Sequence, residues 1–376
     1  MSALGRIRLI LFFTRGISLS TWDKIGMLER EVALYRRMHD YGIGVSFVTY
    51  GGAEDLRYAE RIPGIPVLCN RWGLSQRFYA RLLPLLYIPH LWRADIYKTN
   101  QTRGAETALR AAQFFRRPLV ARCGYMWSQF IDKGKGAGSK MAQQVRTQEA
   151  QVFTSSARVV VTAEHMKHYV AEQYGIANNK VTVIPNYVLT DIFRPDLDII
   201  CKPGRICFIG RLDAQKNLFA LLGAISGLDV ELEVIGDGPQ RESLEVTARE
   251  EGVNACFLGN RPHMALPRHL NDAEIFVLPS LYEGHPKTLL EAMACGRPVI
   301  GADVPGIREL IHHRETGYLC GTSPAEIRVA IQDVRADKAL QKKMGKNARQ
   351  FVVEHFSLEK VLKMELSLLK DVAGIR

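Results

Sequence analysis

The strongest constraint on the fold is an alternation of short apolar runs with longer amphipathic stretches along the whole chain. Parallel strands buried on both faces of a sheet are apolar throughout, and the connection between two of them is usually a helix. The alternation therefore predicts an α/β fold of parallel sheets covered by helices. The expected strands are Ile7–Phe13, Val45–Val48, Val67–Cys69, Ile96–Lys98, Leu119–Arg122, Val159–Val161, Val181–Ile184, Arg205–Ile209, Glu231–Ile235, Ala255–Leu258, Ile275–Leu278 and Val299–Ile300.

An interruption of this pattern divides the chain near residues 186–202, where Pro195 lies and periodicity is lost. A length of 376 residues, of which 47% are apolar, is enough for two cores. We expect an N-terminal domain over residues 1–190 and a C-terminal domain over residues 191–356. The second half repeats the architecture of the first without repeating its sequence.

Helices are expected between the strands. Those of the first half are Thr21–Asp40, Gly104–Phe115, Ser139–Phe153 and Glu164–Tyr174. The last segment, Ser357–Val372, places Leu and Val at helical spacing with Lys on the other face, which predicts an amphipathic helix.

The loop after the strand Ile275–Leu278 has the features of a ligand site. Open α/β sheets bind ligands at the carboxyl ends of their strands. Gly284 allows close approach to the backbone, and Pro286 suits the first position of the helix that continues to Ala294. The free N–H groups of that first turn favour an anion such as a diphosphate.

Two carboxylates flank this helix start. Acids repel phosphate, but a carboxylate offers two acceptor oxygens to the hydroxyl groups of a sugar or a ribose. Glu283 and Glu291 therefore point to a nucleotide sugar. The alternative is that Glu283 is a first-turn acid and Glu291 a solvated helix residue.

Residues 203–320 resemble glycosyltransferase family 4, the retaining GT-B glycosyltransferases. The signature of that family is two glutamates separated by seven residues and followed by AMACGxPVI, which appears here as Glu283, Glu291 and AMACGRPVI. Further matches in the family's order are FIGRLDAQKN at 208–217, VIGDGP at 234–239, FLGN at 257–260, GIRELI at 306–311 and ETGYL at 315–319, and VIPNYVLTDIFRP at 183–195 resembles the segment that joins the two domains.

The resemblance implies the GT-B fold, with two Rossmann-like domains facing across a cleft. It also implies that the last helix, within residues 357–376, crosses back to the N-terminal domain, whereas a plain helix of the C-terminal domain is the alternative. The implied activity is transfer of a sugar from a UDP- or GDP-sugar to a glycan or lipid-linked acceptor, in the biosynthesis of a cell-surface polysaccharide or glycolipid.

The resemblance assigns the diphosphate to two cations. Arg211 ends a strand and Lys216 follows at the next helix, so both can reach a leaving diphosphate. Two cations and a helix N-terminus would neutralise it without Mg²⁺, so no metal and no cofactor are expected. Asp196 and Asp198 spell a metal motif of GT-A enzymes, but they lie in the expected linker. The alternative is that Arg211 and Lys216 are ordinary solvated cations.

Other residues match donor-binding positions of the family. Gly236 lies in a turn that helps to shape the nucleotide side, although a tight strand-to-helix turn explains it equally well. The full set of expected donor contacts is Gly16, Gly210, Gly236, Asn260, Arg261, Gly284, His285, Pro286, Lys287, Thr288, Leu289 and Glu291.

Retention of anomeric configuration by double displacement needs a carboxylate nucleophile. The family places the residue matching Glu283 at the sugar hydroxyls and the residue matching Glu291 at the ribose. We therefore expect same-face substitution, in which Arg211 and Lys216 stabilise the leaving diphosphate while its oxygen takes the acceptor's proton. The expected catalytic residues are Arg211, Lys216 and Glu283.

The N-terminal half departs from the family, many of whose members carry a His after a central strand. Here that neighbourhood reads VARCGYMWSQF and contains no His. His165 is the nearest candidate, although a helix-surface or core position explains it as well. The expected acceptor contacts are Asn100, Arg103, Arg122, Tyr125 and His165, and ordinary surface polarity explains Asn100 and Arg103 equally well. The missing His leaves open a sugar-binding or scaffold protein that has lost transfer.

Charge and cysteine content bear on partners and compartment. Residues 1–190 hold 26 Lys and Arg against 13 Asp and Glu, a balance of +13, whereas residues 191–376 hold 24 against 26, a balance of −2. The basic half predicts an anionic partner such as a membrane surface. Basicity alone also permits nucleic acid, but no recognised binding motif accompanies it, so none is expected. Seven Cys without paired spacing indicate reduced thiols and a cytoplasmic protein.

The segment Arg77–Arg93, RFYARLLPLLYIPHLWR, mixes Arg with aromatic residues and Leu, as a segment lying in a lipid interface does. The alternative is a core helix broken by Pro84 and followed by a loop. The apolar stretch Ile7–Phe13 is too short for a membrane span and fits a first buried strand better. We expect a cytoplasmic protein, with peripheral attachment to the inner face of the membrane as the further hypothesis.

Overall fold

The computed structural model describes residues 7–135 and 139–375. The chain divides into two compact units. Unit 1 comprises the chain up to Pro185 together with the segment from Leu362 onward, and unit 2 comprises Asn186–Val361. The boundary lies shortly before the expected residue 190. Helix α16 (Leu358–Ala373) begins in unit 2 and belongs to unit 1 from Leu362 on, so the last helix does return to the N-terminal unit.

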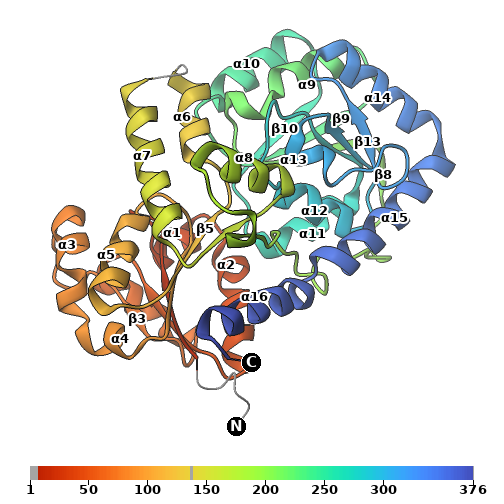
Figure 1. Cartoon of the computed structure of the whole chain (residues 1–376). Helices are drawn as coiled ribbons and strands as arrows, with labels where there is room; N and C mark the ends of the chain where they lie inside the picture. The colour runs from red at the N-terminus through yellow and green to blue at the C-terminus, as the bar shows by residue number, and fades with distance from the viewer. Residues whose placement is uncertain (1–6, 136–138, 376) are drawn as a thin grey trace. The chain divides into compact units, whose positions relative to one another are not determined.

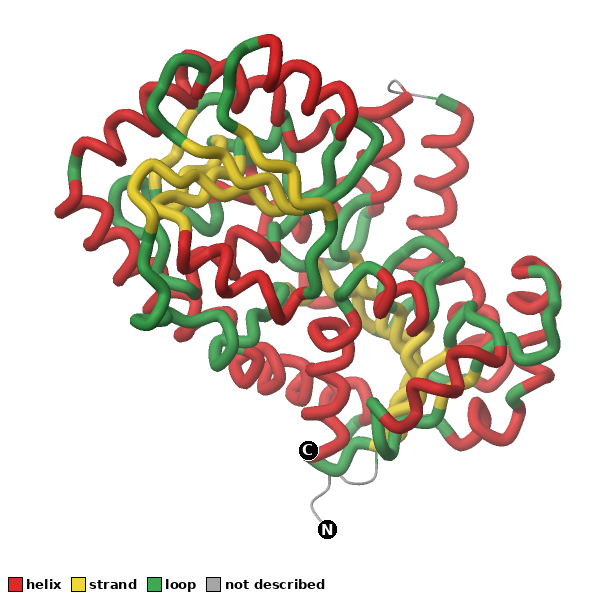
Figure 2. Tube along the Cα trace, turned by 180° about the vertical axis from the view of Figure 1, so that it is seen from behind, coloured by secondary structure: helices red, strands yellow, loops and turns green. Residues whose placement is uncertain are grey.

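Unit 1, as far as it is described, is built on a seven-stranded parallel sheet with the order β3-β2-β1-β4-β5-β6-β7. Figures 1 and 2 show helices on both sides of this sheet. Its strands are β1 (Arg8–Phe12), β2 (Gly44–Val48), β3 (Val67–Leu68), β4 (Ile96–Thr99), β5 (Leu119–Cys123), β6 (Arg158–Val161) and β7 (Val181–Val183). Its helices are α1 (Leu19–Lys24), α2 (Leu28–Asp40), α3 (Gln76–Leu86), α4 (Ile88–Arg93), α5 (Ala105–Phe115), α6 (Trp127–Lys135), α7 (Lys140–Ser155) and α8 (Glu164–Tyr174), with 3-10 helices at Ala53–Glu60 and Asn178–Lys180.

Unit 2, all of whose residues are described, has a six-stranded parallel sheet with the order β10-β9-β8-β11-β12-β13. Its strands are β8 (Lys202–Ile209), β9 (Glu231–Ile235), β10 (Ala255–Gly259), β11 (Ala273–Leu278), β12 (Val299–Ala302) and β13 (Tyr318–Cys320). Its helices are α9 (Leu218–Ile225), α10 (Arg241–Glu250), α11 (Leu266–Asp272), α12 (Lys287–Ala294), α13 (Pro305–Arg308), α14 (Pro324–Ala336) and α15 (Lys338–Phe356), with 3-10 helices at Ala214–Lys216 and His263–Ala265.

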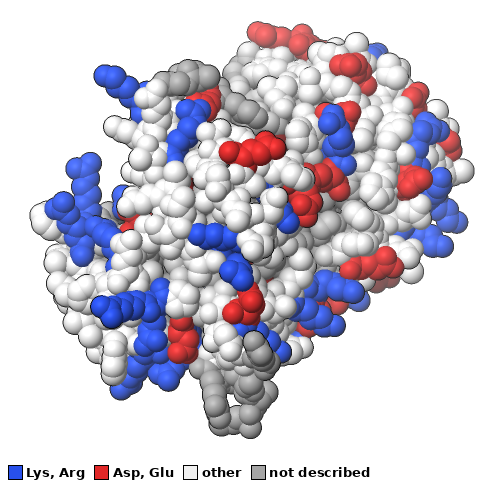
Figure 3. Space-filling model, viewed as in Figure 1, with Lys and Arg blue, Asp and Glu red and all other residues white. Residues whose placement is uncertain are grey.

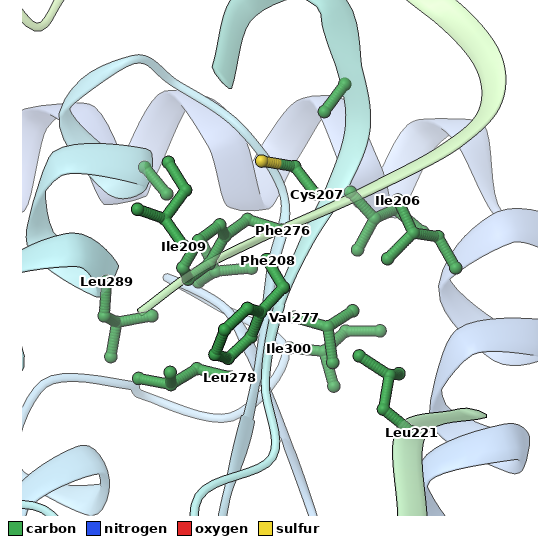
Figure 4. Packing of buried hydrophobic residues seen from close by; sticks show 14 of the residues in the cluster. Ile206, Cys207, Phe208, Ile209, Leu221, Phe276, Val277, Leu278, Leu289 and Ile300 are labelled. Carbon is green, nitrogen blue, oxygen red and sulfur yellow. The ribbon is translucent and has the colours of Figure 1, made fainter. Parts of the chain in front are cut away.

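The core of unit 2 shows why its strands are apolar throughout. Every residue of β11 is buried, because helices cover both faces of the sheet. Phe208 of β8, Phe276 of β11 and Leu289 of α12 belong to one buried cluster, whose packing is shown in Figure 4. Burial of this apolar surface is the main force that holds the strands in place. The loops at the strand ends are therefore carried on a rigid support.

The structure corrects several expectations. The predicted helix Thr21–Asp40 is two helices, α1 and α2, because Gly26 adopts a left-handed conformation between them, with φ of 72°. Pro84 lies inside α3 and does not break it. Pro286 is the N-cap of α12 rather than its first residue. Strand β13, in the ETGYL segment, was not expected as a strand, since its three residues carry too little pattern.

Each sheet has one position where the order in which successive strands are added reverses. In unit 1 it lies between β1 and β4, and in unit 2 between β8 and β11. From such a pair the connections leave in opposite directions, so the loops at the carboxyl ends separate and create a crevice where ligands bind. Among the described residues, none of the helices has both the length and the apolarity needed to cross a bilayer.

Candidate functional site

Two loops far apart in sequence are joined at the crevice of unit 2. One follows β8 and the other follows β11. The backbone N–H of Leu281 donates to the carbonyl of Gln215 at 2.8 Å, and the Gln215 side chain donates to the Tyr282 carbonyl at 2.8 Å. The side chain of Asn217 donates to the Pro279 carbonyl at 3.2 Å. These bonds hold the two loops as one structural element at the carboxyl edge of the sheet.

The same loops bring together two of the expected catalytic residues. Lys216 Nζ lies 2.5 Å from Glu283 Oε1, and the exposed fractions of the two side chains are 15% and 8%. Arg211, by contrast, has 68% of its side chain exposed and lies 3.6 Å from Asp213. Of the two cations, Arg211 is therefore the one open to an incoming anion, while Lys216 is already held by a carboxylate. Burial, followed by the negative charges of Asp213 and Glu283, raises the pKa of Tyr282.

The start of α12 presents backbone donors at this place. Pro286 is its N-cap, and no side chain of the described residues caps it. A Cβ added to Gly306 would lie 2.4 Å from the carbonyl oxygens of Glu283 and of Gly284, so only a glycine at 306 allows α13 to pack under this loop. The glycine of the GIRELI motif is therefore explained by its close packing against the loop that carries Glu283. Uncapped N–H groups and the helix dipole favour an anion at this position.

Glu291 is buried on α12, which contradicts its interpretation as a solvated helix residue. Its Oε1 lies 2.8 Å from Nε2 of His263, and each side chain has only 1% of its surface exposed. Glu283 lies in the loop before α12, so it is not a first-turn acid either. Sequence reasoning missed His263. Its position after FLGNRP gave no signal of the pairing, because the pairing depends on how α12 packs beside the loop after β10.

The glycines of the β8 and β9 loops meet backbone to backbone. Gly236 has φ of 134°, and a Cβ added there would lie 1.9 Å from the carbonyl oxygen of Gly210. This close contact by itself requires a glycine at position 236. It therefore favours the interpretation of Gly236 as part of a tight strand-to-helix turn. Asn260 and Arg261 follow the neighbouring strand β10 and are exposed at the same edge of the sheet.

The remaining expected donor contacts divide by exposure. Lys287 and Thr288 are half-buried in the first turn of α12. The carbonyl of His285 accepts a hydrogen bond of 2.8 Å from Asn186, and its ring lies 5.3 Å from that of Phe356. The side chain of Leu289 is wholly buried in the core of unit 2 (Figure 4), so only its backbone can face a ligand.

The corresponding edge of unit 1 gathers the expected acceptor residues. The loop after β1 is bound to the loop after β4, because the N–H of Arg15 donates to the Arg103 carbonyl at 3.1 Å. The loop after β4 is in turn bound to the loop after β5, where the N–H of Gly124 donates to the Gln101 side chain at 2.8 Å. Asn100 begins the loop after β4, and Tyr125 lies in the loop after β5.

Three other expected residues lie along the same edge. Gly16, with φ of 82°, lies in the loop after β1. Arg122 is in β5, and a Cβ added to the nearby Gly124 would approach its guanidinium at 3.4 Å. His165 is the second residue of α8, after β6, and is half-buried. The hydroxyl of Thr162 donates to the Gly124 carbonyl at 3.3 Å, which links the loops after β5 and β6.

Two Rossmann-like units with parallel sheets are the architecture expected of a GT-B glycosyltransferase. The comparisons with known families agree. Residues 190–351 match the family described as glycosyl transferases group 1, and residues 26–187 match the glycosyl transferase 4-like domain. The chain belongs to the glycosyltransferase family 4 group, and it is a glycosyltransferase.

Curated relatives carry related activities. The glycogen synthase of Mycobacterium tuberculosis is 26% identical over 286 residues, which are 72% of this chain and 67% of that enzyme. The N-acetyl-alpha-D-glucosaminyl L-malate synthase of Bacillus anthracis is 35% identical over 162 residues, 42% of each protein. The matched part thus spans from less than half to about two thirds of these relatives.

Solved structures show the same fold over nearly the whole chain. The sucrose-phosphate synthase from Thermosynechococcus elongatus has a TM-score of 0.81 at 20% identity and covers 99% of this chain and 100% of its own. Anabaena HepE in complex with UDP and glucose has a TM-score of 0.79 at 17% identity and covers 96% and 99%.

Proposed function

We propose that this protein is a retaining glycosyltransferase that moves a sugar from a UDP- or GDP-sugar to a glycan or lipid-linked acceptor. The observation that carries the proposal is the joined pair of loops in unit 2, with Glu283 held by Lys216 beside the uncapped start of α12. The UDP and glucose bound to Anabaena HepE support the choice of a nucleotide sugar. The product would belong to a cell-surface polysaccharide or glycolipid.

The diphosphate of the donor would lie at the start of α12. There the backbone N–H groups and the exposed guanidinium of Arg211 supply positive charge, and Lys216 adds more at the side of Glu283. These groups make a metal unnecessary for charge neutralisation, so we propose a metal-independent reaction. Activity that persists after dialysis against EDTA is the expected result.

The sugar would be transferred by same-face substitution. The bond from the anomeric carbon to the diphosphate breaks, and the acceptor oxygen bonds to that carbon on the same face. The acceptor's proton passes to the leaving phosphate oxygen. Because Lys216 holds Glu283, this carboxylate is better placed to accept from sugar hydroxyls than to attack the anomeric carbon. Azide rescue of Glu283→Ala that yields an inverted glycosyl azide would reveal a covalent nucleophile and overturn this mechanism.

Glu291 would accept from the ribose hydroxyls, as the residue at this position of the family does. Its burial means that the ligand must reach an enclosed carboxylate whose orientation His263 fixes. The acceptor would contact Asn100, Arg103 and neighbouring residues at the carboxyl edge of unit 1. We further propose that the enzyme is cytoplasmic and attached to the inner face of the membrane.

The experiment that tests the donor site uses Arg211→Gln, since Glu291 is too deeply buried for a clean substitution. Thermal shifts with UDP, GDP, ADP and CMP should single out one nucleotide, because a ligand at about 100 times its Kd stabilises a protein by about 2.7 kcal/mol. Arg211→Gln should weaken the binding of that nucleotide about tenfold, since a charge-assisted hydrogen bond is lost. Lys342→Gln, which removes an exposed cation on α15, is the matched control.

Turnover separates an enzyme from a binding protein. The loop after β5 has no His, which favours a sugar-binding or scaffold role as the second candidate. A competent site should slowly hydrolyse the donor and release a sugar whose first-formed anomer, followed by NMR, keeps the configuration of the donor. Tight nucleotide binding without hydrolysis or transfer would favour the scaffold, and no shift with any nucleotide would contradict both.

A further inference from the structure

The outer surface of α3 and α4 in unit 1 is unusually apolar for a surface. Large side chains point outward along it, with exposed fractions of 61% for Phe78 and 64% for Trp92. Helix α5 packs against both helices and adds Phe114, whose exposed fraction is 64%. The exposed apolar residues of this α3–α4 surface are Phe78, Leu82, Leu85, Ile88, Trp92 and Phe114.

Helix α3 is apolar on two sides. Tyr79 and Leu83 are buried and attach the helix to the core of unit 1. Phe78, Leu82 and Leu85 follow a separate stripe at spacings of four and three residues, and that stripe faces solvent. A surface helix with one buried side normally has polar residues on the other. The core therefore accounts for only half of the apolar pattern of Arg77–Arg93.

The charge of this surface has one sign. Between Glu60 and Asp95 the sequence contains five Arg and no acidic residue. Arg77, Arg81 and Arg93 are exposed beside the apolar stripe. In Figure 3, Lys and Arg appear among uncharged residues over α3 and α4, at the left of the view. Arginine can extend its guanidinium past an apolar surface to reach anionic groups.

We propose that the α3–α4 surface docks on an anionic lipid bilayer. A bilayer surface offers acyl chains to Phe78 and Trp92 and negative headgroups to the arginines, which matches both properties together. Tryptophan is particularly suited to the boundary between headgroups and acyl chains. A second copy of the chain fits less well, because a symmetric contact would bring the arginines of the two copies together. The inference deepens the membrane attachment proposed above by assigning it to one surface of unit 1, and it is independent of the transfer reaction.

The first test is sedimentation of the full chain with vesicles. Vesicles of phosphatidylcholine with 30% phosphatidylglycerol by composition are compared with pure phosphatidylcholine at about 0.1 M salt. The wild type should pellet with the anionic vesicles and stay in solution with the neutral ones. Arg77→Gln with Arg81→Gln should lower the partition coefficient about 30-fold, since each Arg near an anionic surface contributes about fivefold. Phe78→Ser with Trp92→Ser should lower it about tenfold at any salt concentration.

Matched controls remove the same chemistry elsewhere. Lys342→Gln with Lys343→Gln removes two exposed cations of α15, and Val329→Ser with Val353→Ser removes two exposed apolar side chains of unit 2. Both control variants should bind vesicles as the wild type does. If the controls lose binding equally, or if neither variant of the α3–α4 surface changes it, the proposal is wrong. It is also wrong if the wild type ignores anionic vesicles, or if it forms a dimer that Phe78→Ser with Trp92→Ser dissociates while vesicles stay unbound.

A second measurement needs no destabilising substitution. Of the four Trp in the chain, Trp72 and Trp92 are exposed, whereas Trp22 is buried. Anionic vesicles that carry brominated acyl chains should quench the tryptophan emission of the wild type. Trp92→Phe keeps the apolar character of the surface and should lose most of that quenching while still pelleting. Unchanged quenching in Trp92→Phe would show that another face meets the lipid.

Discussion

Removing the imidazole of His263 should destabilise unit 2 strongly. The substitution His263→Ala leaves the Glu291 carboxylate, with 1% of its side chain exposed, without its partner at 2.8 Å. Because both side chains are buried, we expect a cost of about 2–3 kcal/mol, near the upper end of the range for a buried polar group that loses a hydrogen bond. For a domain of this size about 1 kcal/mol corresponds to 2–4 °C, so the melting temperature should fall by roughly 4–12 °C.

The chain supplies its own control for this prediction. His269 lies 2.9 Å from Glu233, but 21% of its side chain is exposed, so water can replace it. His269→Ala should therefore cost only about 1 kcal/mol. Thermal and urea unfolding of both variants provide the comparison. If His263→Ala melts within about 2 °C of the wild type, or no lower than His269→Ala, the buried pair does not hold Glu291 and the reasoning fails.

A double variant separates stability from function. Replacing both partners with apolar residues of similar size, as His263→Leu with Glu291→Met, should recover most of the lost stability, because no buried charge remains. The same variant should lose the thermal shift with nucleotide if Glu291 accepts from the ribose. A stable double variant that binds nucleotide as tightly as the wild type would show that Glu291 has only a structural part.

Three further changes test other features. Lys98 and Glu365 form a wholly buried pair, 2.5 Å apart, that attaches α16 to β4. In urea unfolding, Lys98→Met should lower the free energy of unfolding by about 3–5 kcal/mol, and Lys98→Met with Glu365→Leu should lower it much less. Equal losses in the two variants would contradict this account. Burial raises the pKa of Glu149, so the folded chain keeps this proton to higher pH than the unfolded chain. The contribution of Glu149 to the free energy of unfolding should accordingly be lost as pH rises from the usual pKa of a glutamate to its higher pKa in the folded chain. The difference in free energy of unfolding between the wild type and Glu149→Gln should change in that direction over this range, and a difference that does not depend on pH would refute the assignment. Gly236→Ala should destabilise by about 1–3 kcal/mol or more in thermal unfolding, because its Cβ would clash with Gly210, and a wild-type melting temperature would exclude the clash.

The fold was largely predictable because its signal is local. Runs such as Glu231–Ile235 are strands in the structure with the same bounds, and helix Glu164–Tyr174 is also found as expected. These elements depend on the apolar period and on turn glycines, which are properties of neighbouring residues. The errors occurred where local pattern is weak, as at Gly26, which divides one expected helix, and at the three residues of β13.

For the candidate site the sequence named residues but not their surroundings. The spacing of Glu283 and Glu291 beside a strand end marked both as functional, since that spacing belongs to a chain segment. The surroundings of the two glutamates differ, and their spacing in the sequence does not predict this difference. Glu283 meets Lys216 across the β8–β11 crevice, and Glu291 meets His263 in the interior.

The sequence by itself determined the parallel-sheet architecture and the amphipathic last helix, because each is encoded by a period of apolar residues along the chain, while the return of that helix was implied by the family resemblance. Tertiary structure alone decided which partner each charged group has and which apolar side chains remain outside. Pairing and exposure depend on contacts between residues far apart in sequence, as between Lys98 and Glu365. For the same reason one stripe of α3 packs into the core while Phe78 faces solvent.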